Sequence, residues 1–545
     1  MSSLVTKTGG VVPTSGPSFS RRDMLRFTGM AGVAAAFSST LAACGGPAST
    51  NATGNTTDSI TAVIGYGNNQ TWDPLQTASA FSMAAILHTY ESLVEGDPIS
   101  REPYAGLAKE LPKVDGTSFE IALRDGAKWH DGQPVTADDV VFTFARVLDP
   151  KENVLVRTFF VPWLQEVKKV DDKTVEFVLT QPFPYVLKRL QTVKICPKHV
   201  FEGGWEAAVS GKVVGSGPYQ VTEQAPLSHT KFEKFADYNG PRPAVYKTML
   251  WNSIVEASPR VAKISGAKPA AQIVENIPPA NADQLAKDGR TVEFADGGNN
   301  LWLMFNTKHA PFDNKLVRQA LHHAVDRKKM IEVGLKGKGS EGTSFINPKT
   351  SGSQPAANDL GYNPDKARQL LQQAGVSNLV VTLSTTNTTL VADCVNVIKE
   401  GWDAIGVQTT LDTQDTKALF SKLDGGFDFQ VVATTQNAEQ FGNDPDLLVR
   451  YYYAGAGVAA KYAQWSGPDH DALIGLLDKA AGETDAGARE NTTKQVLDLL
   501  ADQAVVYPVV FTQLGTAWDP KTISGVRAQG YPGINLNQAK PGGPA

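Results

Sequence analysis

Short stretches in which apolar and polar residues alternate predict strands in the first half of the chain. Residues 60–64, Ile-Thr-Ala-Val-Ile, have the composition of a strand, and apolar side chains occupy every second position in residues 119–123 and 175–179. A period of two is typical of strands that bury one face. We therefore expect strands at these three places.

Apolar positions that recur every three or four residues predict helices between the strands. Thr136 stands three residues before Asp139, which resembles the capping box at the start of a helix. Residues 317–325 carry an apolar stripe at helical spacing, and another helix is expected from Asn363, before a proline, to a stop at Gly375. Helices and strands mix throughout without a repeat of fixed period, so the class is α/β or α+β.

Residues 1–43 have the features of an export signal. Arg21 and Arg22 match a twin-arginine motif, and the apolar stretch 27–43 ends in Leu-Ala-Ala-Cys44, which matches the lipobox of bacterial lipoproteins. The stretch is shorter than the ~20 residues that a membrane span needs. A basic region, a short apolar core and a small-residue cleavage site in this order favour a signal peptide over a buried helix with a chance cysteine.

Cleavage before Cys44 would leave a lipid on the first residue of the mature protein. Residues 45–58 contain no apolar residue larger than alanine, so 44–58 is expected to be a lipidated cysteine with a flexible tether. No later run approaches 18 apolar residues, and the lipid would be the membrane anchor. We expect an extracytoplasmic protein at the outer face of the cytoplasmic membrane or in the periplasm.

Length and charge narrow the class of protein. A chain of 545 residues is too long for one core, so two or three domains are expected. It carries 51 Lys and Arg against 56 Asp and Glu, a formal net charge of −5, which gives no support to nucleic-acid binding. Besides Cys44, the cysteines are Cys196 and Cys394; both are expected to be buried thiols, with a disulfide between them left open.

Motifs for catalysis or cofactor binding are weak. Residues 337–342, Gly-Lys-Gly-Ser-Glu-Gly, have the spacing of a dinucleotide fingerprint, but they follow a predicted helix rather than a strand, so we expect a loop. The eight histidines include no pair at the i, i+4 spacing of a helical zinc site, and no Gly-x-Ser-x-Gly elbow is present. We predict no catalytic residues, no metal and no cofactor.

Residues 119–144 resemble the signature of the family 5 extracellular solute-binding proteins, the dipeptide- and oligopeptide-binding subunits of ABC importers. The resemblance covers about residues 60–530. Further matching segments follow in the same order as in that family: Gly215-Ser-Gly-Pro-Tyr219, Asp237-Tyr-Asn-Gly240, Asn306 with Pro311–Ala320, Tyr362-Asn-Pro364 and Gly426-Phe-Asp428.

The resemblance implies an α/β fold of the periplasmic-binding-protein type, with two lobes, a hinge (type II, cluster C) and an extra inserted domain. Ligand would be enclosed in the cleft between the lobes. The first domain would be discontinuous and the second inserted into it, with hinge crossovers near residues 299 and 515. The implied limits are 59–75, 208–299 and 516–545 for domain I, 76–207 for domain II, and 300–515 for domain III.

The chain departs from peptide-binding members where those hold the ligand's α-amine. They carry an aspartate shortly before an Asp-Pro pair, and a tryptophan a few residues earlier. Here Asp444-Pro445 is present, but Gln440 or Phe441 falls at the aspartate position and Thr434 near the tryptophan position. Glu439 is a candidate replacement for the amine-binding acid. Asp444 itself is expected to cap a helix.

Aromatic residues in segments that border the family's cleft are further candidates, although each of them also fits a role in the core. Their rings suit either peptide side chains or sugar rings. The candidate ligand-binding residues are Trp72, Trp302, Gln436, Glu439, Phe441, Tyr451, Tyr453 and Trp465, with Tyr452 also considered.

The expected function is a monomeric, lipid-anchored receptor that delivers a small solute to an ABC permease. A short peptide or peptide-like compound is the preferred ligand, and an oligosaccharide is the alternative. An extracellular hydrolase is disfavoured because nucleophile, metal and phosphate motifs are missing. A surface adhesion protein would not need the importer signature.

Overall fold

The computed structural model describes residues 58–67, 72–77, 79–152, 154, 156–204, 213–225, 227–350, 352–426, 428–455 and 457–542. The predicted export signal with Arg21 and Arg22, and the predicted lipid site at Cys44, lie outside these residues. Within the described part of the chain, no helix combines the length and the apolar character required to cross a membrane.

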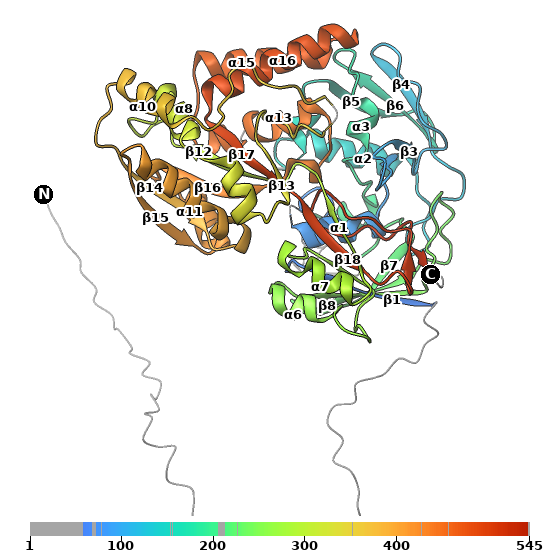
Figure 1. The fold of residues 1–545 in the computed structure, drawn as a ribbon. Helices are drawn as coiled ribbons and strands as arrows, with labels where there is room; N and C mark the ends of the chain where they lie inside the picture. Colours follow the sequence, from blue (N-terminus) through green and yellow to red (C-terminus); the bar gives the residue numbers. More distant parts are fainter. Residues whose placement is uncertain are drawn as a thin grey trace, which may run out of the picture. The chain divides into compact units, whose positions relative to one another are not determined.

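The first large sheet has seven strands in the order β11-β18-β10-β1-β9-β8-β7 (Figure 1). Its central strand β1 pairs in parallel with β9 and β10, whereas β18 is antiparallel to β10 and β11. Three helices belong to this part of the chain. The bounds are β1 Ser59–Ile64, β7 Tyr219–Ala225, β8 His229–Lys234, β9 Thr248–Ser253, β10 Ile273–Glu275, β11 Thr291–Ala295, β18 Leu514–Trp518, α1 Ala80–Thr89, α6 Ala257–Ala262 and α7 Ala282–Lys287.

The second large sheet has six strands in the order β13-β17-β12-β16-β14-β15. Strands β14, β15 and β16 are parallel to one another, while β12 is antiparallel to both of its neighbours. The strand bounds are β12 Asn300–Phe305, β13 Gly339–Glu341, β14 Val380–Thr386, β15 Gln408–Gln414, β16 Val431–Gln436 and β17 Val506–Thr512.

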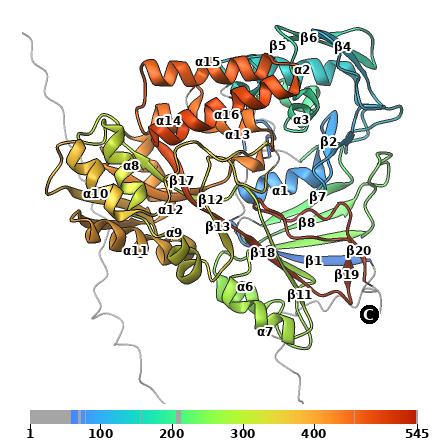
Figure 2. The same ribbon diagram turned by 45° about the horizontal axis from the view of Figure 1, so that its top comes forward.

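Helices flank this second sheet, and we call the sheet and these helices together the second lobe (Figure 2). They include the pair α15 and α16, which run side by side in both views. Their bounds are α8 Lys315–His323, α9 Arg327–Lys329, η4 Met330–Gly334, α10 Pro364–Gln373, α11 Thr389–Ala404, α12 Thr416–Asp424, η5 Ala438–Gln440, α13 Pro445–Tyr453, α14 Val458–Lys461, α15 Pro468–Gly482 and α16 Ala486–Gln503.

A smaller three-stranded sheet, in the order β4-β6-β5, lies between β1 and β7 in the sequence. Its apolar face belongs to a core cluster that continues through Trp163 and Phe159 to Tyr452 of α13, so this inserted part packs directly on the second lobe. The remaining bounds are β2 Val94–Gly96, β3 Pro103–Ala105, β4 Ser118–Ala122, α2 Ala137–Leu148, η2 Arg157–Phe159, β5 Leu164–Lys169, β6 Thr174–Leu179, α3 Val186–Leu190, α4 Lys198–Phe201, η3 Pro279–Asn281, β19 Ile523–Ser524 and β20 Lys540–Pro541.

The chain passes between the two large sheets at two places, from β11 to β12 and from β17 to β18 (Figure 1). The two crossing segments are hydrogen-bonded to each other. Thr512 N donates to Asn299 O at 2.8 Å, and Gln513 Nε2 donates to Asp296 Oδ1 at 2.9 Å. Two adjacent short connections of this kind form a hinge about which two lobes can rotate.

The local predictions of strand and helix are largely confirmed. The three predicted strands are β1, β4 and β6, and the capping signal starts α2, where Asp139 Oδ2 accepts from the N–H of Thr136 at 2.9 Å. Asn363 caps α10 by accepting from Lys366 N, and Gly375, with φ +69°, follows its end. Two predictions were wrong. The apolar stripe runs to residue 325, but α8 already ends at His323. The predicted loop 337–342 contains the strand β13.

Cys196 and Cys394 are both buried free thiols. Cys394 lies on the buried face of α11, in agreement with the expected buried thiol. Burial raises the pKa of Cys394 to about 12, so this thiol is unreactive at neutral pH.

Candidate functional site

Each large sheet has one edge where parallel strands end together. In the second sheet, β14 lies between β15 and β16, so the crossovers through α11 and α12 leave in opposite directions. In open α/β sheets, the carboxyl ends of strands at such a switch point are where ligands bind. Thr386 ends β14 beside Thr434 of β16, and their hydroxyl oxygens are 3.2 Å apart.

The corresponding edge of the first sheet is the end of β1 and β10. Glu275, the last residue of β10, is buried, and its carboxylate accepts from Gly65 N at 2.8 Å and from Gly533 N at 2.7 Å. Burial raises the pKa of Glu275 to about 7, although the two N–H donors and the charge of Arg260 oppose the shift. This carboxylate therefore ties the segment around Gly533 to the end of the central strand.

We refer to residues 436–441, which follow β16, as the β16 wall. Asn437 accepts from Glu439 N at 2.9 Å, which sets the turn, and its Nδ2 donates to Gly530 O at 3.0 Å. Arg101 Nη2 donates to Glu439 O at 3.3 Å, and its guanidinium lies 4.6 Å from the centre of the Tyr531 ring. The β16 wall thus contacts the segment 530–531 that follows the first sheet.

Glu439 lies in a tightly packed part of this wall. It is 8% exposed, and its Oε1 accepts from the hydroxyl of Thr350 at 2.8 Å. A Cβ added at Gly298 would stand 2.7 Å from Glu439 Cγ, so glycine is required there for the close approach. Among the described residues, Thr350 is the one donor to this carboxylate, which leaves acceptor capacity for a further partner.

Gln436, Phe441 and Tyr451 lie together beside Glu439. Gln436 Nε2 donates to the hydroxyl of Tyr451 at 2.5 Å, and the ring of Phe441 lies 5.2 Å from that of Tyr451. On its other side, Phe441 is 6.1 Å from the ring of Phe159, which belongs to the inserted part of the chain. The rings of Phe441 and Tyr451 form an apolar shelf, and Phe159 covers it.

Trp302 of β12 pairs with Thr434 of β16, so both side chains lie on one face of the second sheet. Trp302 is 1% exposed, and its indole Nε1 has no hydrogen-bond partner among the described residues; the same holds for Oε1 of the partly buried Gln436. A buried donor and a buried acceptor without partners are unusual in native structures and call for an explanation.

Three predicted ligand residues lie in packed cores. Trp72 belongs to the core of the first sheet, and its Nε1 donates to Gln224 Oε1 at 2.6 Å. The hydroxyl of Tyr453 donates to Val506 O at 2.6 Å, and Trp465 packs edge-to-face on the Tyr453 ring at 5.6 Å. These partners give all three a structural role, and their contact with ligand stays a prediction.

Asp444 caps α13, as expected, by accepting from Leu447 N at 2.9 Å. The sequence did not indicate its second partner, Arg189 of α3, which donates to both carboxylate oxygens at 2.8 Å. Arg189 also donates to Asp446, which pairs with Arg450 as well. Burial opposes ionisation of Asp446, but Arg450 and Arg189 outweigh it and hold its pKa below the ordinary value.

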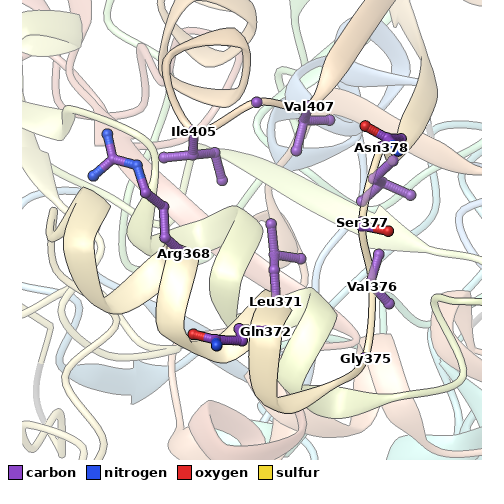
Figure 3. A pocket seen from close by; sticks show the side chains of 11 residues that line it. Arg368, Leu371, Gln372, Gly375, Val376, Ser377, Asn378, Ile405 and Val407 are labelled. Carbon is purple, nitrogen blue, oxygen red and sulfur yellow. The ribbon is translucent and has the colours of Figure 1, made fainter.

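A concave surface of about 520 Å³ lies elsewhere on the second lobe, between the end of α10 and the turn before β15 (Figure 3). It borders the first residues of β14 and β15, the opposite edge from the switch point. The Arg368 side chain at its rim is engaged by Asp365 at 2.6 Å and by Ala404 O at 3.2 Å. We therefore place the candidate site at the β16 wall.

Arg101, Asn437 and Tyr531 were missed by sequence reasoning. Arg101 and Tyr531 lie in separate segments of irregular structure, and no local pattern relates them to residue 439. In the part of the chain that the structure describes, no three His, Cys, Asp or Glu side chains are grouped so that they could hold a metal ion.

Comparison with known proteins gives consistent matches. The family model for "Bacterial extracellular solute-binding proteins, family 5 Middle" matches residues 102–462. The chain is 26% identical over 486 residues to the dipeptide-binding protein of Escherichia coli K12, covering 83% of this chain and 89% of that protein. It is 27% identical over 460 residues to heme-binding protein A of Haemophilus influenzae, covering 78% and 82%.

Solved structures share the fold at lower sequence identity. The dipeptide-binding protein of Pseudoalteromonas sp. SM9913 in complex with Met-Leu superposes with a TM-score of 0.77 at 21% identity, covering 89% of this chain and 100% of that one. A periplasmic protein of Agrobacterium tumefaciens R10 in complex with agropinic acid gives a TM-score of 0.77 at 22% identity, covering 89% and 99%.

Proposed function

Because the chain belongs to family 5 of the bacterial extracellular solute-binding proteins, we propose that it captures a short peptide or peptide-like solute between its two lobes and delivers it to an ABC permease. The observation that carries this proposal is the position of the β16 wall. The wall follows a strand at the switch point of one sheet and contacts residues 530–531 of the other lobe through Asn437 and Arg101. A solute bound there would touch both lobes.

Glu439 is the proposed anchor for the α-amine of a peptide. Its carboxylate has one donor, Thr350, among the described residues and can accept from an ammonium group at its other oxygen. A charge-assisted hydrogen bond in such a buried place contributes about 1.5–3 kcal/mol. Rotation about the two hinge segments would separate Gly298 and Gly530 from the wall and admit the ligand.

Relatives named for dipeptides, such as the Escherichia coli protein, support the peptide as the first choice of ligand. Other similar proteins are named for other solutes: one relative for heme, and one structure of the same fold for agropinic acid. The ligand class of this chain therefore depends on its own wall residues.

An oligosaccharide is the second candidate, and one observation favours it. The face of the second sheet beside the wall presents uncharged groups: the hydroxyls of Thr386 and Thr434, the amide of Gln436 and the indole of Trp302. Trp302 Nε1 and Gln436 Oε1 are an unused donor and an unused acceptor. A hydroxyl group both donates and accepts, so it would satisfy both.

We also propose that the receptor works as a monomer held at the membrane by a lipid on Cys44. The support is the order of the export motif, the apolar core and the lipobox in residues 20–44. A lipid anchor keeps the receptor close to a membrane-embedded permease without a spanning helix.

The direct test of the ligand class is mass spectrometry of the solute that remains bound to protein purified without refolding. A peptide of a few residues supports the first candidate, and a carbohydrate supports the second. A protein that carries neither, and that shows no thermal shift with peptide or oligosaccharide libraries, contradicts solute capture.

A further inference from the structure

Arg327, at the start of the short helix α9, is a fully buried arginine for which the described residues supply no partner. It is 0% exposed, and none of its three nitrogens, Nε, Nη1 and Nη2, has a hydrogen-bond partner among these residues. No carboxylate of the described residues lies within ion-pairing distance of its guanidinium. The preceding residue, Asp326, uses its side chain to cap α9 at Lys329 N.

The other buried arginines of the described chain are all held by acceptors. Arg318, on the neighbouring helix α8, donates to Gln503 O and Phe312 O at 2.7 Å each. Each remaining member of the set donates at least two hydrogen bonds to carbonyl or carboxylate oxygens: Arg146, Arg189, Arg260, Arg290 and Arg450. Among the described residues, Arg327 is therefore the one buried arginine whose guanidinium has no acceptor.

His322 adds a second unpartnered group beside Arg327. Its ring is 0% exposed between Phe305, at 5.8 Å, and Tyr507, at 5.7 Å, and neither ring nitrogen has a hydrogen-bond partner in the part of the chain that the structure describes. Burial, and then the charge of Arg327, hold the pKa of His322 well below its ordinary value. The imidazole is therefore neutral and carries one N–H donor.

The charge of Arg327 is not removed by deprotonation, since a guanidinium stays protonated in proteins. The carboxylates of Asp359 and Glu341 act on it electrostatically from beyond hydrogen-bond range, and Asp359 is exposed and accepts from Gly361 N. A buried charge with no compensation is strongly destabilising. A water molecule would satisfy one or two donors but would leave the charge in place.

We propose that Arg327 and His322 form a binding site for a small inorganic anion of the size of chloride, inside the second lobe. The guanidinium supplies five N–H donors and a positive charge, and His322 supplies one more donor. The anion must be compact, because the nitrogen atoms of both side chains are screened from solvent. By binding next to Tyr507 of β17, it would stabilise the strand that leads into the hinge. This inference is independent of the ligand class proposed above.

The first test is the melting temperature of the full-length protein at constant ionic strength, with sodium gluconate replaced stepwise by sodium chloride. We expect the melting temperature to rise by about 2–4 °C with a saturable dependence on chloride, because an ion that binds only the native state stabilises it by mass action. Arg327→Met should abolish this dependence. Arg368→Met, which alters an exposed arginine paired with Asp365, should retain it.

The second test does not depend on a variant that must fold. Crystals of the native protein grown in sodium bromide should show an anomalous peak within hydrogen-bond distance of the Arg327 guanidinium. A halide peak there, together with the chloride-dependent melting, supports the site. A water molecule or a carbonyl oxygen at that position, or equal melting temperatures in chloride and gluconate, overturns the proposal.

Discussion

Arg189 and Asp444 lie 255 residues apart in the sequence and form a buried ion pair with two hydrogen bonds of 2.8 Å. Both side chains are 0% exposed. The pair joins α3 of the inserted part to the first residue before α13 of the second lobe, and Phe159 O accepts from the same guanidinium at 2.7 Å. It fixes the end of the β16 wall, because Asp444 follows that wall by three residues.

Replacing Arg189 by methionine should destabilise the protein by about 3–5 kcal/mol, because Asp444 and Asp446 stay buried without the guanidinium that pairs with both of them. The free energy of unfolding from denaturant titration measures the loss. The double variant Arg189→Met with Asp444→Asn should recover part of it, since asparagine still caps a helix. A loss below about 1 kcal/mol, typical of exposed pairs, would contradict this account of the ion pair.

Stability should depend on pH through Glu275. Its pKa is about 7 in the folded protein, above the ordinary value of a glutamate, so the folded state holds the proton more tightly than the unfolded state. The contribution of Glu275 to the free energy of unfolding should therefore decrease by about 3 kcal/mol as pH rises from about 4.5 to 7. Buried His88 and His322, whose pKa values are held below the ordinary value mainly by burial, act in the opposite direction, so the contribution of Glu275 is read from a difference between two profiles.

Glu275→Gln is the matched variant for this profile. The amide cannot ionise, so the contribution of Glu275 should disappear, and the free energy of unfolding of the native protein should fall relative to that of the variant as pH rises from about 4.5 to 7. Thermal or denaturant melts at half-unit pH steps decide the question. A variant whose profile runs parallel to the native profile between pH 4.5 and 7 is incompatible with a buried Glu275 of raised pKa.

Cys44→Ser should release the protein from membranes, because the lipobox cysteine is the one predicted anchor. Fractionation of cells after a high-salt wash measures the distribution. Replacing Arg21 and Arg22 by lysine should separately block export and leave a precursor in the cytoplasm. Sedimentation of the Cys44 variant with membranes would show that another segment holds the protein there.

The contact between Asn437 and Gly530 should favour the closed arrangement of the lobes. Asn437→Ala removes that donor and should weaken solute binding by roughly 2- to 12-fold, the effect of one hydrogen bond of about 0.5–1.5 kcal/mol. Small-angle scattering of the native protein should show a smaller radius of gyration when solute is saturating. An unchanged radius would argue against lobe closure.

Sequence patterns predicted the elements whose signals are local. The capping pair Thr136 and Asp139, and the limits of α10 at Asn363 and Gly375, depend on neighbours within a few residues. The strand β13 was missed because Gly339–Glu341 pairs with β17, about 170 residues later, and has no alternation of its own.

The site was predicted less completely for a related reason. An aromatic residue near a cleft and one in a core have the same local signature, so Trp465, packed on Tyr453, was indistinguishable from Phe441, which lies on the β16 wall. Arg101 reaches the backbone of Glu439 from 338 residues away, and nothing near it in the sequence indicates that contact.

Calorimetry on the native protein and two variants tests the central claim, that the β16 wall binds a peptide through Glu439. Di- and tripeptides with a free amine should bind, and Glu439→Gln should weaken them roughly 10- to 150-fold. N-acetylated peptides should bind the native protein equally poorly, and Phe441→Ala, which trims the shelf covered by Phe159, should have the smaller effect. Native protein that gives no heat with any peptide but binds a neutral oligosaccharide, or a Glu439→Gln variant with unchanged peptide affinity, would contradict the claim.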